Sequence, residues 1–151
     1  MSLRLTRYEG GPAPWDELVR RRGCLYQRWD FAAALETSLR RPVVRVGVGD
    51  GSDLRAALAL LVVRSPLFGR FAVSLPVSDH AGVVHEDEEA LSVLAEGLPG
   101  LLGDLGVRWI ELRHLADAAP PLSLPVSGHK ITLELDLPPS ADELWDGLKA
   151  K

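Results

Sequence analysis

The chain has 151 residues, enough for one domain with a buried core. Its 46% hydrophobic and 25% charged residues are typical of a globular protein and exclude a largely disordered or membrane-embedded chain. The net charge of −4 is unevenly divided: residues 1–70 carry 12 arginines against 7 acidic residues, and residues 71–151 carry 5 lysines and arginines against 14 acidic residues. This division argues against a protein that coats nucleic acid, but leaves room for a local basic patch that meets phosphate.

Neither a membrane span nor an export signal is visible. The longest apolar run, residues 56–63, is far shorter than the ~20 residues that cross a bilayer, and the N-terminus lacks an apolar signal core. Cys24 is the only cysteine, which agrees with a reducing compartment. We therefore expect a cytoplasmic protein.

The first half of the chain predicts a strand, two helices and a hairpin. Residues 3–7 alternate as a short strand does, and a helix follows from Pro14 to about Gly23, closed by arginines at the end that favours cations. A second helix is expected at about residues 29–39. Residues 43–48 and 54–63 are then two strands joined by a tight turn, and the second is apolar on both faces and so central.

The second half predicts three more strands and two helices. Residues 71–75 form a strand with a short continuation at residues 83–84, and the acids 86–89 open a helix that Pro99 kinks or splits. Strands follow at residues 107–112 and 131–137. Ser140 opens a last helix with a capping box, and that helix is still running at Lys151. The order predicts an α/β (α+β) domain in which helices flank a mixed, largely antiparallel sheet.

Two stretches of sequence carry a family resemblance. Residues 65–82, with Leu-Pro-Val-Ser-Asp-His-Ala-Gly at their end, are followed by Val-Arg-Trp-Ile-Glu-Leu-Arg at residues 107–113. Tyr-Gln-Arg-Trp at residues 26–29, His129-Lys130 and Leu144-Trp145 add to the pattern. Together these motifs resemble the first module of bacterial FemAB-type acyltransferases of the GNAT superfamily, including versions associated with exopolysaccharide and exosortase systems.

The resemblance implies a fold, an activity and a missing part. FemAB-type proteins have two GNAT-like modules, and well-known members move an amino acid from aminoacyl-tRNA onto a peptidoglycan precursor. Residues 1–151 would form a single GNAT-like module, truncated in its C-terminal helix and inactive alone. The implied partners are aminoacyl-tRNA or another acyl donor, a cell-envelope or polysaccharide precursor, and a second module or partner chain.

Asp79 and His80 are the candidate catalytic residues. They are adjacent in a loop after a strand, a position where a rigid scaffold often displays functional groups. Acyl transfer from an ester to an amine needs positioning, a proton acceptor and oxyanion stabilisation. His80 would serve as base or hydrogen-bond donor, and Asp79 would orient a substrate ammonium. The alternative is structural: Asp79 caps a turn through backbone N–H groups and His80 packs beside it.

Arg28, Ser78 and Arg113 are the candidate substrate-binding residues. Ser78 directly precedes the Asp79-His80 pair, and Arg28 stands beside Trp29. Arg113 follows Glu111 by two positions, so the two side chains project to one face of a strand and form an ion pair. The competing interpretation of Arg113 is a phosphate contact. Trp29 and Trp109 are interpreted as core aromatics rather than stacking platforms.

The sequence predicts no metal and no cofactor. The spacing of Asp79, His80, His85 and His114 matches no known metal site. The glycines at residues 47–51 lead into a hairpin, whereas a pyrophosphate loop needs a helix N-terminus after it, so acetyl-CoA is not supported. The rival to an acyltransferase is a non-catalytic GNAT-like module that docks to a partner chain. An exposed apolar face is expected where the second module would sit, and it would cause self-association.

Overall fold

The computed structural model describes residues 3–49, 53–114, 122, 124–127 and 136–148. Their elements, in chain order, are β1 (Arg4–Arg7), α1 (Pro12–Arg22), the 3₁₀ turn η1 (Leu25–Gln27), α2 (Trp29–Leu39), β2 (Val43–Gly49), β3 (Leu54–Ser65), β4 (Gly69–Val73), β5 (Val84–His85), α3 (Glu88–Leu105), β6 (Ile110–Glu111) and α4 (Ala141–Gly147). In the described residues no helix is both long and apolar enough to cross a bilayer.

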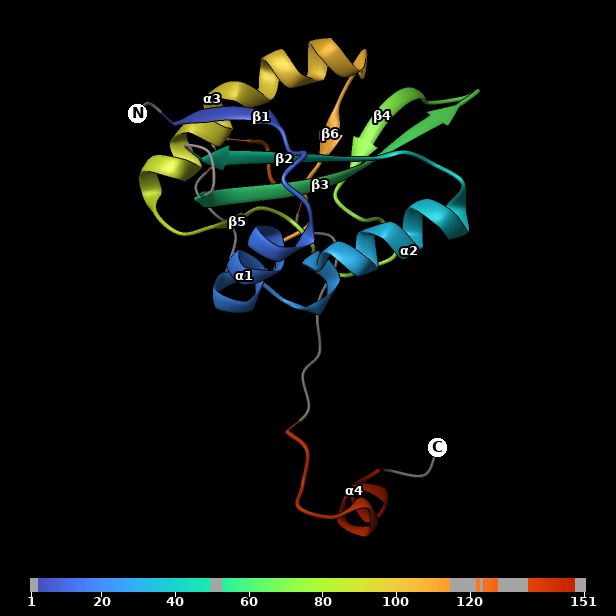
Figure 1. Ribbon diagram of the computed structural model, residues 1–151. Helices are drawn as coiled ribbons and strands as arrows, with labels where there is room; N and C mark the ends of the chain where they lie inside the picture. The colour runs from blue at the N-terminus through green and yellow to red at the C-terminus, as the bar shows by residue number, and fades with distance from the viewer. Residues whose placement is uncertain (1–2, 50–52, 115–121, 123, 128–135, 149–151) are drawn as a thin grey trace.

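Three layers make up the domain, with the sheet in the middle (Figure 1). The strand order is β1-β2-β3-β4-β6, and β5 also pairs with β3. Every pair is antiparallel except β4 with β6, which is parallel. Helix α3 covers one face, and α1 and α2 cover the other. The prediction of a largely antiparallel sheet flanked by helices is confirmed.

Strand β3 is central, as its apolar run predicts. Residues 56–62 of this strand are all buried, and its two faces contribute to two different clusters of apolar side chains. Ala56, Leu58 and Leu60 belong to the cluster under α3, whereas Ala57 and Leu61 belong to the cluster under α1 and α2. Alternate residues of a strand point to opposite faces, so a strand between two helical layers must be apolar throughout.

The helices follow their sequence signals closely. Trp15, Leu18 and Val19 are the buried face of α1, and its last turn holds three arginines. The Asp87 carboxylate accepts the N–H of Ala90 at 3.0 Å and caps α3. Pro99 does not split α3, which continues as one helix to Leu105. The helix tolerates this proline because only one intrahelical hydrogen bond is lost and the leucines on either side remain packed on the sheet.

Two other expectations need correction. Residues 83–84 do not continue β4; Val84 and His85 form β5, which pairs with Ala57 and Ala56 of β3. Helix α4 begins after the Ser140 cap, as predicted, but ends at Gly147, and Leu148 has an extended backbone. Glycine is a poor helix former, which explains an end at this position. The strand expected at residues 131–137 lies mostly outside the described residues.

One edge of β3 has a gap that positions a loop. Strand β4 pairs with residues 61–65 of β3, and β5 pairs with residues 56–57 on the same edge. Between these two pairings the chain leaves the sheet, over residues 74–83. This segment, here called the 74–83 loop, contains the Ser78-Asp79-His80 motif.

Candidate functional site

The ends of the only parallel strand pair in the described sheet hold the 74–83 loop in place. The Ser74 N–H donates to the Glu111 carbonyl at 2.9 Å, and the Ala81 N–H donates to the Arg113 carbonyl at 3.1 Å. Both bonds join the loop to the stretch that continues β6. Because parallel strands end at the same edge of a sheet, the loop and residues 111–114 meet there, a place where α/β proteins commonly bind ligands.

Arg113 fixes the inside of this loop. Its Nη1 donates to the carbonyls of Pro76 and, at 3.2 Å, of Ser78, and its Nε donates to Glu111 at 2.7 Å. Its backbone N–H donates to the Ser74 hydroxyl at 2.8 Å. The predicted Glu111–Arg113 ion pair is therefore confirmed. These contacts occupy most of the guanidinium, and its use as a substrate ligand stays a prediction.

Ser78 closes the turn that begins at Leu75. The Ser78 hydroxyl donates to the Leu75 carbonyl at 2.7 Å, and its N–H donates to the same oxygen at 3.1 Å. Ser78 is almost fully buried. Leu75 is fully buried in the left-handed region, with φ 42°, a conformation that costs free energy in a residue with a side chain. The hydroxyl of Ser78 thus has a structural partner within the loop.

Asp79 and His80 have different surroundings. Asp79 is exposed, and among the described residues its carboxylate accepts no hydrogen bond, so the turn-capping role proposed for it is taken by Ser78. His80 is half-buried with its ring edge-on to Tyr26 at 5.5 Å between centroids. Its Nδ1 is buried without a hydrogen-bond partner in the described part of the chain. These two side chains remain the candidates for catalysis.

The 3₁₀ turn η1 supports the loop from the other side. The Gln27 side-chain amide donates to the Gly82 carbonyl at 3.0 Å, and the Cys24 thiol lies 3.7 Å from the His80 carbonyl. The Trp15 indole N–H donates to the Gln27 carbonyl at 2.8 Å. The turn, the loop and the core of α1 are therefore connected, which makes the position of His80 depend on η1.

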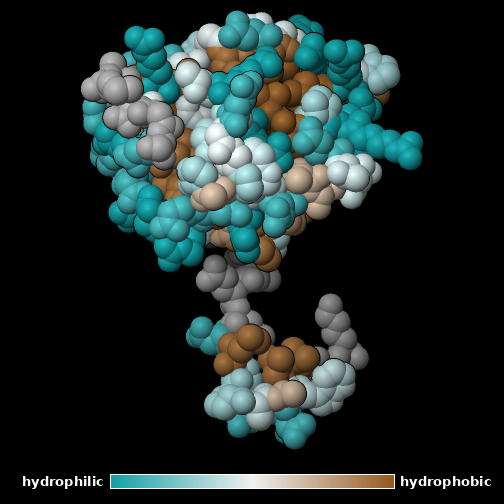
Figure 2. All heavy atoms as spheres, viewed as in Figure 1, coloured by the Kyte–Doolittle hydropathy of each residue, from teal (hydrophilic) through white to brown (hydrophobic). Residues whose placement is uncertain are grey.

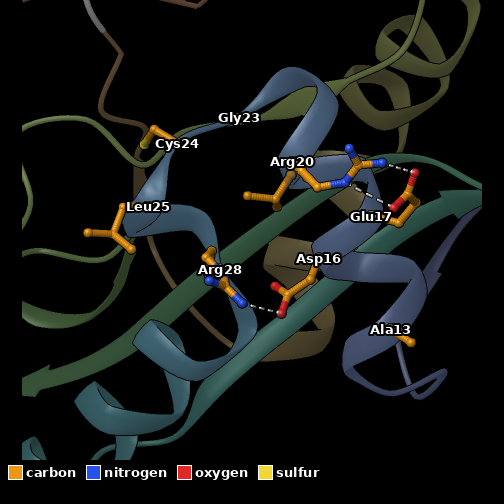
Figure 3. A pocket seen from close by; sticks show the side chains of 9 residues that line it. Ala13, Asp16, Glu17, Arg20, Gly23, Cys24, Leu25 and Arg28 are labelled. Carbon is orange, nitrogen blue, oxygen red and sulfur yellow. Dashed lines mark hydrogen bonds and ion pairs between the residues drawn. The ribbon is translucent and has the colours of Figure 1, made fainter.

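Arg28 lines a pocket of about 400 Å³ between α1 and η1 (Figure 3). Its guanidinium approaches the Asp16 carboxylate at 3.4 Å, and Asp16 also accepts the Trp29 N–H at 2.9 Å. Glu17 and Arg20 form a second ion pair on the pocket wall. Cys24 lines the pocket as well. The role of Arg28 in substrate binding stays a prediction.

His114 is a residue of the site that the sequence did not single out for this role. The Val83 N–H donates to its Nε2 at 2.9 Å, and its ring lies so close to Gly82 that a Cβ there would clash. Burial, with a smaller effect from His85, lowers the pKa of His114 to about 4. The neutral ring is therefore part of the structure that ends the loop. Within the described residues, no three potential ligands are placed to hold a metal ion.

This arrangement predicts acid sensitivity that depends on His114. Because its pKa is about 4 in the folded chain and ordinarily 6.5, the unfolded chain binds the proton more tightly. The contribution of the neutral His114 ring to the free energy of unfolding is fully present above pH 6.5 and is lost as the pH falls from 6.5 to 4. For a partly buried ring we expect a loss of about 1–2 kcal/mol. Urea unfolding of the wild type and His114→Asn from pH 7 to 4.5 measures it; parallel pH curves would contradict the assignment.

Comparisons with known proteins show the fold. No protein-family model matches the sequence, and no curated protein matches it significantly. A solved acetyltransferase from Trypanosoma brucei is similar to this chain with a TM-score of 0.56 and 15% identity, over 90% of this chain and 100% of that one. A ribosomal-protein-alanine N-acetyltransferase from Brucella melitensis biovar Abortus 2308 aligns with a TM-score of 0.49 and 15% identity, over 88% and 100%. The likeness to the Trypanosoma brucei structure shows that the chain shares the fold of that solved acetyltransferase.

The helix after the 74–83 loop does not fit an acyl-CoA pyrophosphate. A helix N-terminus binds phosphate through free N–H groups and its positive dipole end. Here the Asp87 carboxylate already accepts the N–H of Ala90, and this bond, followed by the ion pair with Arg55, lowers the pKa of Asp87. Glu86, Glu88 and Glu89 add negative charge at the same end. The capped N–H and these acids, which Arg21, Arg22 and Arg55 already pair, make this helix N-terminus a poor site for a pyrophosphate.

Proposed function

We propose that this chain is the first, GNAT-like module of a bacterial FemAB-like acyltransferase of the cytoplasm. The complete enzyme would transfer an aminoacyl or other acyl group to an amine of a cell-envelope or polysaccharide precursor. The observation that supports it best is the exposed Asp79 carboxylate, free of hydrogen bonds to the described residues, on a loop held at the ends of β4 and β6. Such a rigid loop can present a charge to a substrate.

The proposed reaction uses few groups. The amine nitrogen attacks the ester carbonyl of the acyl donor, the C–N bond forms, and the ester C–O bond breaks as its oxygen leaves with a proton. Asp79 holds the ammonium form of the acceptor, and His80 accepts the proton that the nitrogen must lose. The Nδ1 atom of His80, which is buried and has no hydrogen-bond partner among the described residues, would accept this proton after the side chain rotates toward the substrate.

The first test is the coding sequence beyond codon 151. A reading frame that continues into a second GNAT-like module supports the proposal, because activity is expected only from the two modules together. A stop codon after Lys151 would contradict it and favour the alternative. The candidate acyl donor is aminoacyl-tRNA, and the assay follows a labelled amino acid from tRNA to a lysine-containing peptide.

In the two-module protein, Asp79→Asn and His80→Gln should each lower the transfer rate by about 100-fold or more, as expected for a lost general base or substrate anchor. Asp104→Asn, which removes an equally exposed carboxylate on α3, is the matched control and should transfer normally. The melting temperature of each variant shows whether it is folded. Folded Asp79 and His80 variants with normal transfer rates would exclude these residues from catalysis.

The alternative is a non-catalytic module that keeps the fold and binds a partner chain. Its specific support is that Ser78, Arg113 and the N-terminus of α3 are already engaged by bonds within the chain. The exposed large apolar residues of the C-terminal segment, Leu137, Trp145 and Leu148, give it a docking element. Figure 2 shows hydrophobic residues gathered on the surface of this segment. This alternative predicts a stable complex with a partner and no transfer in the assay above.

A further inference from the structure

Three arginines form a row across the sheet beyond the end of α3. Arg64 of β3 and Arg70 of β4 are directly opposite each other in the strand register. The Arg108 N–H donates to the Arg70 carbonyl at 2.9 Å, and Arg108 precedes Ile110, the partner of Ala72, by two residues. Arg64 and Arg70 therefore point to the same face of the sheet, and the Arg108 backbone lies beside Arg70, one strand spacing of ~4.8 Å further on.

The arginine row is not neutralised by ion pairs within the described part of the chain. Among the described residues none of the three arginines forms an ion pair. Other arginines of the domain do, for example Arg20, Arg55 and Arg113. Like charges directly opposite in a sheet are destabilising. Arg70 lies near the C-terminus of α3, whose dipole favours a cation, but Arg64 and Arg108 are exposed beyond it. The Nε of Arg70 is buried and unpaired in this region.

An apolar tip stands next to the arginine row. Leu67 and Phe68, at the turn between β3 and β4, are 88% and 67% exposed. No other two consecutive large apolar residues in the described part of the chain are both exposed. The Ser65 hydroxyl accepts the N–H groups of both residues, at 3.3 and 3.2 Å, and Gly69 completes the turn with φ +74°. The tip is thus an ordered turn held by hydrogen bonds, and the β3–β4 hairpin projects it outward from the domain (Figure 1).

Charged side chains gather at both ends of α3. The acids 86–89 lie at its N-terminus and the arginine row lies beyond its C-terminus. A helix of 18 residues is about 27 Å long, so the two charged regions lie at opposite ends of the domain. At the N-terminus of α3, Arg21, Arg22 and Arg55 form ion pairs with these acids, whereas the arginine row forms none among the described residues. A negatively charged surface would therefore meet unpaired cations at the hairpin end, despite the net charge of −4.

We infer that the β3–β4 hairpin tip docks on an anionic membrane surface, with Leu67 and Phe68 entering the interface and the arginine row binding lipid phosphates. Exposed apolar side chains beside unpaired cations are the combination that holds proteins on such surfaces. A nucleic acid is favoured less, because the nearby aromatic rings, Phe71 and Trp109, are stacked on each other at 4.3 Å on the opposite face of the sheet. This inference is independent of the proposed acyl transfer.

The test measures binding of the 151-residue chain to vesicles by cosedimentation. We expect binding to vesicles of phosphatidylglycerol and phosphatidylcholine, and at least tenfold weaker binding to phosphatidylcholine alone. Arg64→Gln with Arg108→Gln should weaken binding by about 25-fold, because each cation near an anionic leaflet contributes roughly fivefold. Leu67→Ser with Phe68→Ser should weaken it by about tenfold or more, and this loss should persist when salt is raised.

A matched control distinguishes the effect of the arginine row on binding from the effect of the net charge of the chain. Arg4→Gln with Arg7→Gln removes the same charge from exposed positions of β1 and should leave binding within about twofold. Equal losses from the two arginine pairs would overturn the proposal, as would equal binding to neutral vesicles. Binding of a short single-stranded RNA with no binding to vesicles would also overturn it. Circular dichroism confirms that each variant is folded.

Discussion

Replacing Leu60 by alanine is expected to lower the free energy of unfolding by about 3 kcal/mol. Leu60 is fully buried at the middle of β3, in the cluster that packs under α3 with Leu94 and Leu98. The side chain lies in the central strand between two layers, so its neighbours cannot collapse into the space without moving a helix or a strand. Urea unfolding followed by tryptophan fluorescence measures the change, with Trp15 as a buried reporter.

Leu67→Ala is the matched control for this prediction. It removes the same atoms from a side chain that is 88% exposed, and should change the free energy of unfolding by less than about 0.5 kcal/mol. A loss below about 1 kcal/mol for Leu60→Ala would show that the layer between β3 and α3 is loosely packed. Leu67 also belongs to the proposed membrane tip, so a stable Leu67→Ala variant shows that a change at the tip leaves the fold intact.

Much of the fold could be predicted because its signals are local. The β2–β3 hairpin is marked by two apolar runs around a turn, and its register pairs Val43 with Leu61 through to Gly49 with Leu54. Helix α2 begins and ends at the residues that its pattern predicts. Periodicity and caps act within a few residues, so a single sequence shows them directly.

The pairing of the short strands could not be predicted. Strands β5 and β6 have two residues each, too few for a period to be recognised. Their partners are chosen by the tertiary structure: β5 takes the edge of β3 that β4 leaves free, and β6 runs parallel to β4 because α3 carries the chain back across the sheet. The gap that positions the 74–83 loop therefore appears only in the structure.

The candidate site shows the same division. The motif at residues 78–80 could be found in the sequence, but its bonds connect distant residues. Arg113 lies 35 residues from the Ser78 carbonyl that it binds, and His114 lies 31 residues from Val83. Side chains that serve a loop in this way have no spacing rule. Residue type alone could not show that Ser78 closes the turn and leaves Asp79 exposed.

Arg113→Met should lower the free energy of unfolding by about 2 kcal/mol and loosen the 74–83 loop. Methionine keeps the apolar stem of the side chain but leaves the Pro76 and Ser78 carbonyls and the Glu111 carboxylate without their donor. Hydrogen exchange should become faster at the Ser78 and Ala81 amides, whereas the β2–β3 amides should stay protected. Arg41→Met, at an exposed position, is the matched control and should change neither.

The same variant distinguishes the two roles of Arg113. If the guanidinium mainly holds the loop, transfer by the two-module protein should fall together with loop protection, and Arg113→Lys should restore little of either, because one ammonium cannot span both carbonyls and Glu111. If loop protection stays normal while transfer is lost, Arg113 binds substrate instead. The positions of Asp79 and His80 are fixed by the loop, so exchange at their amides links the geometry of the site to its chemistry.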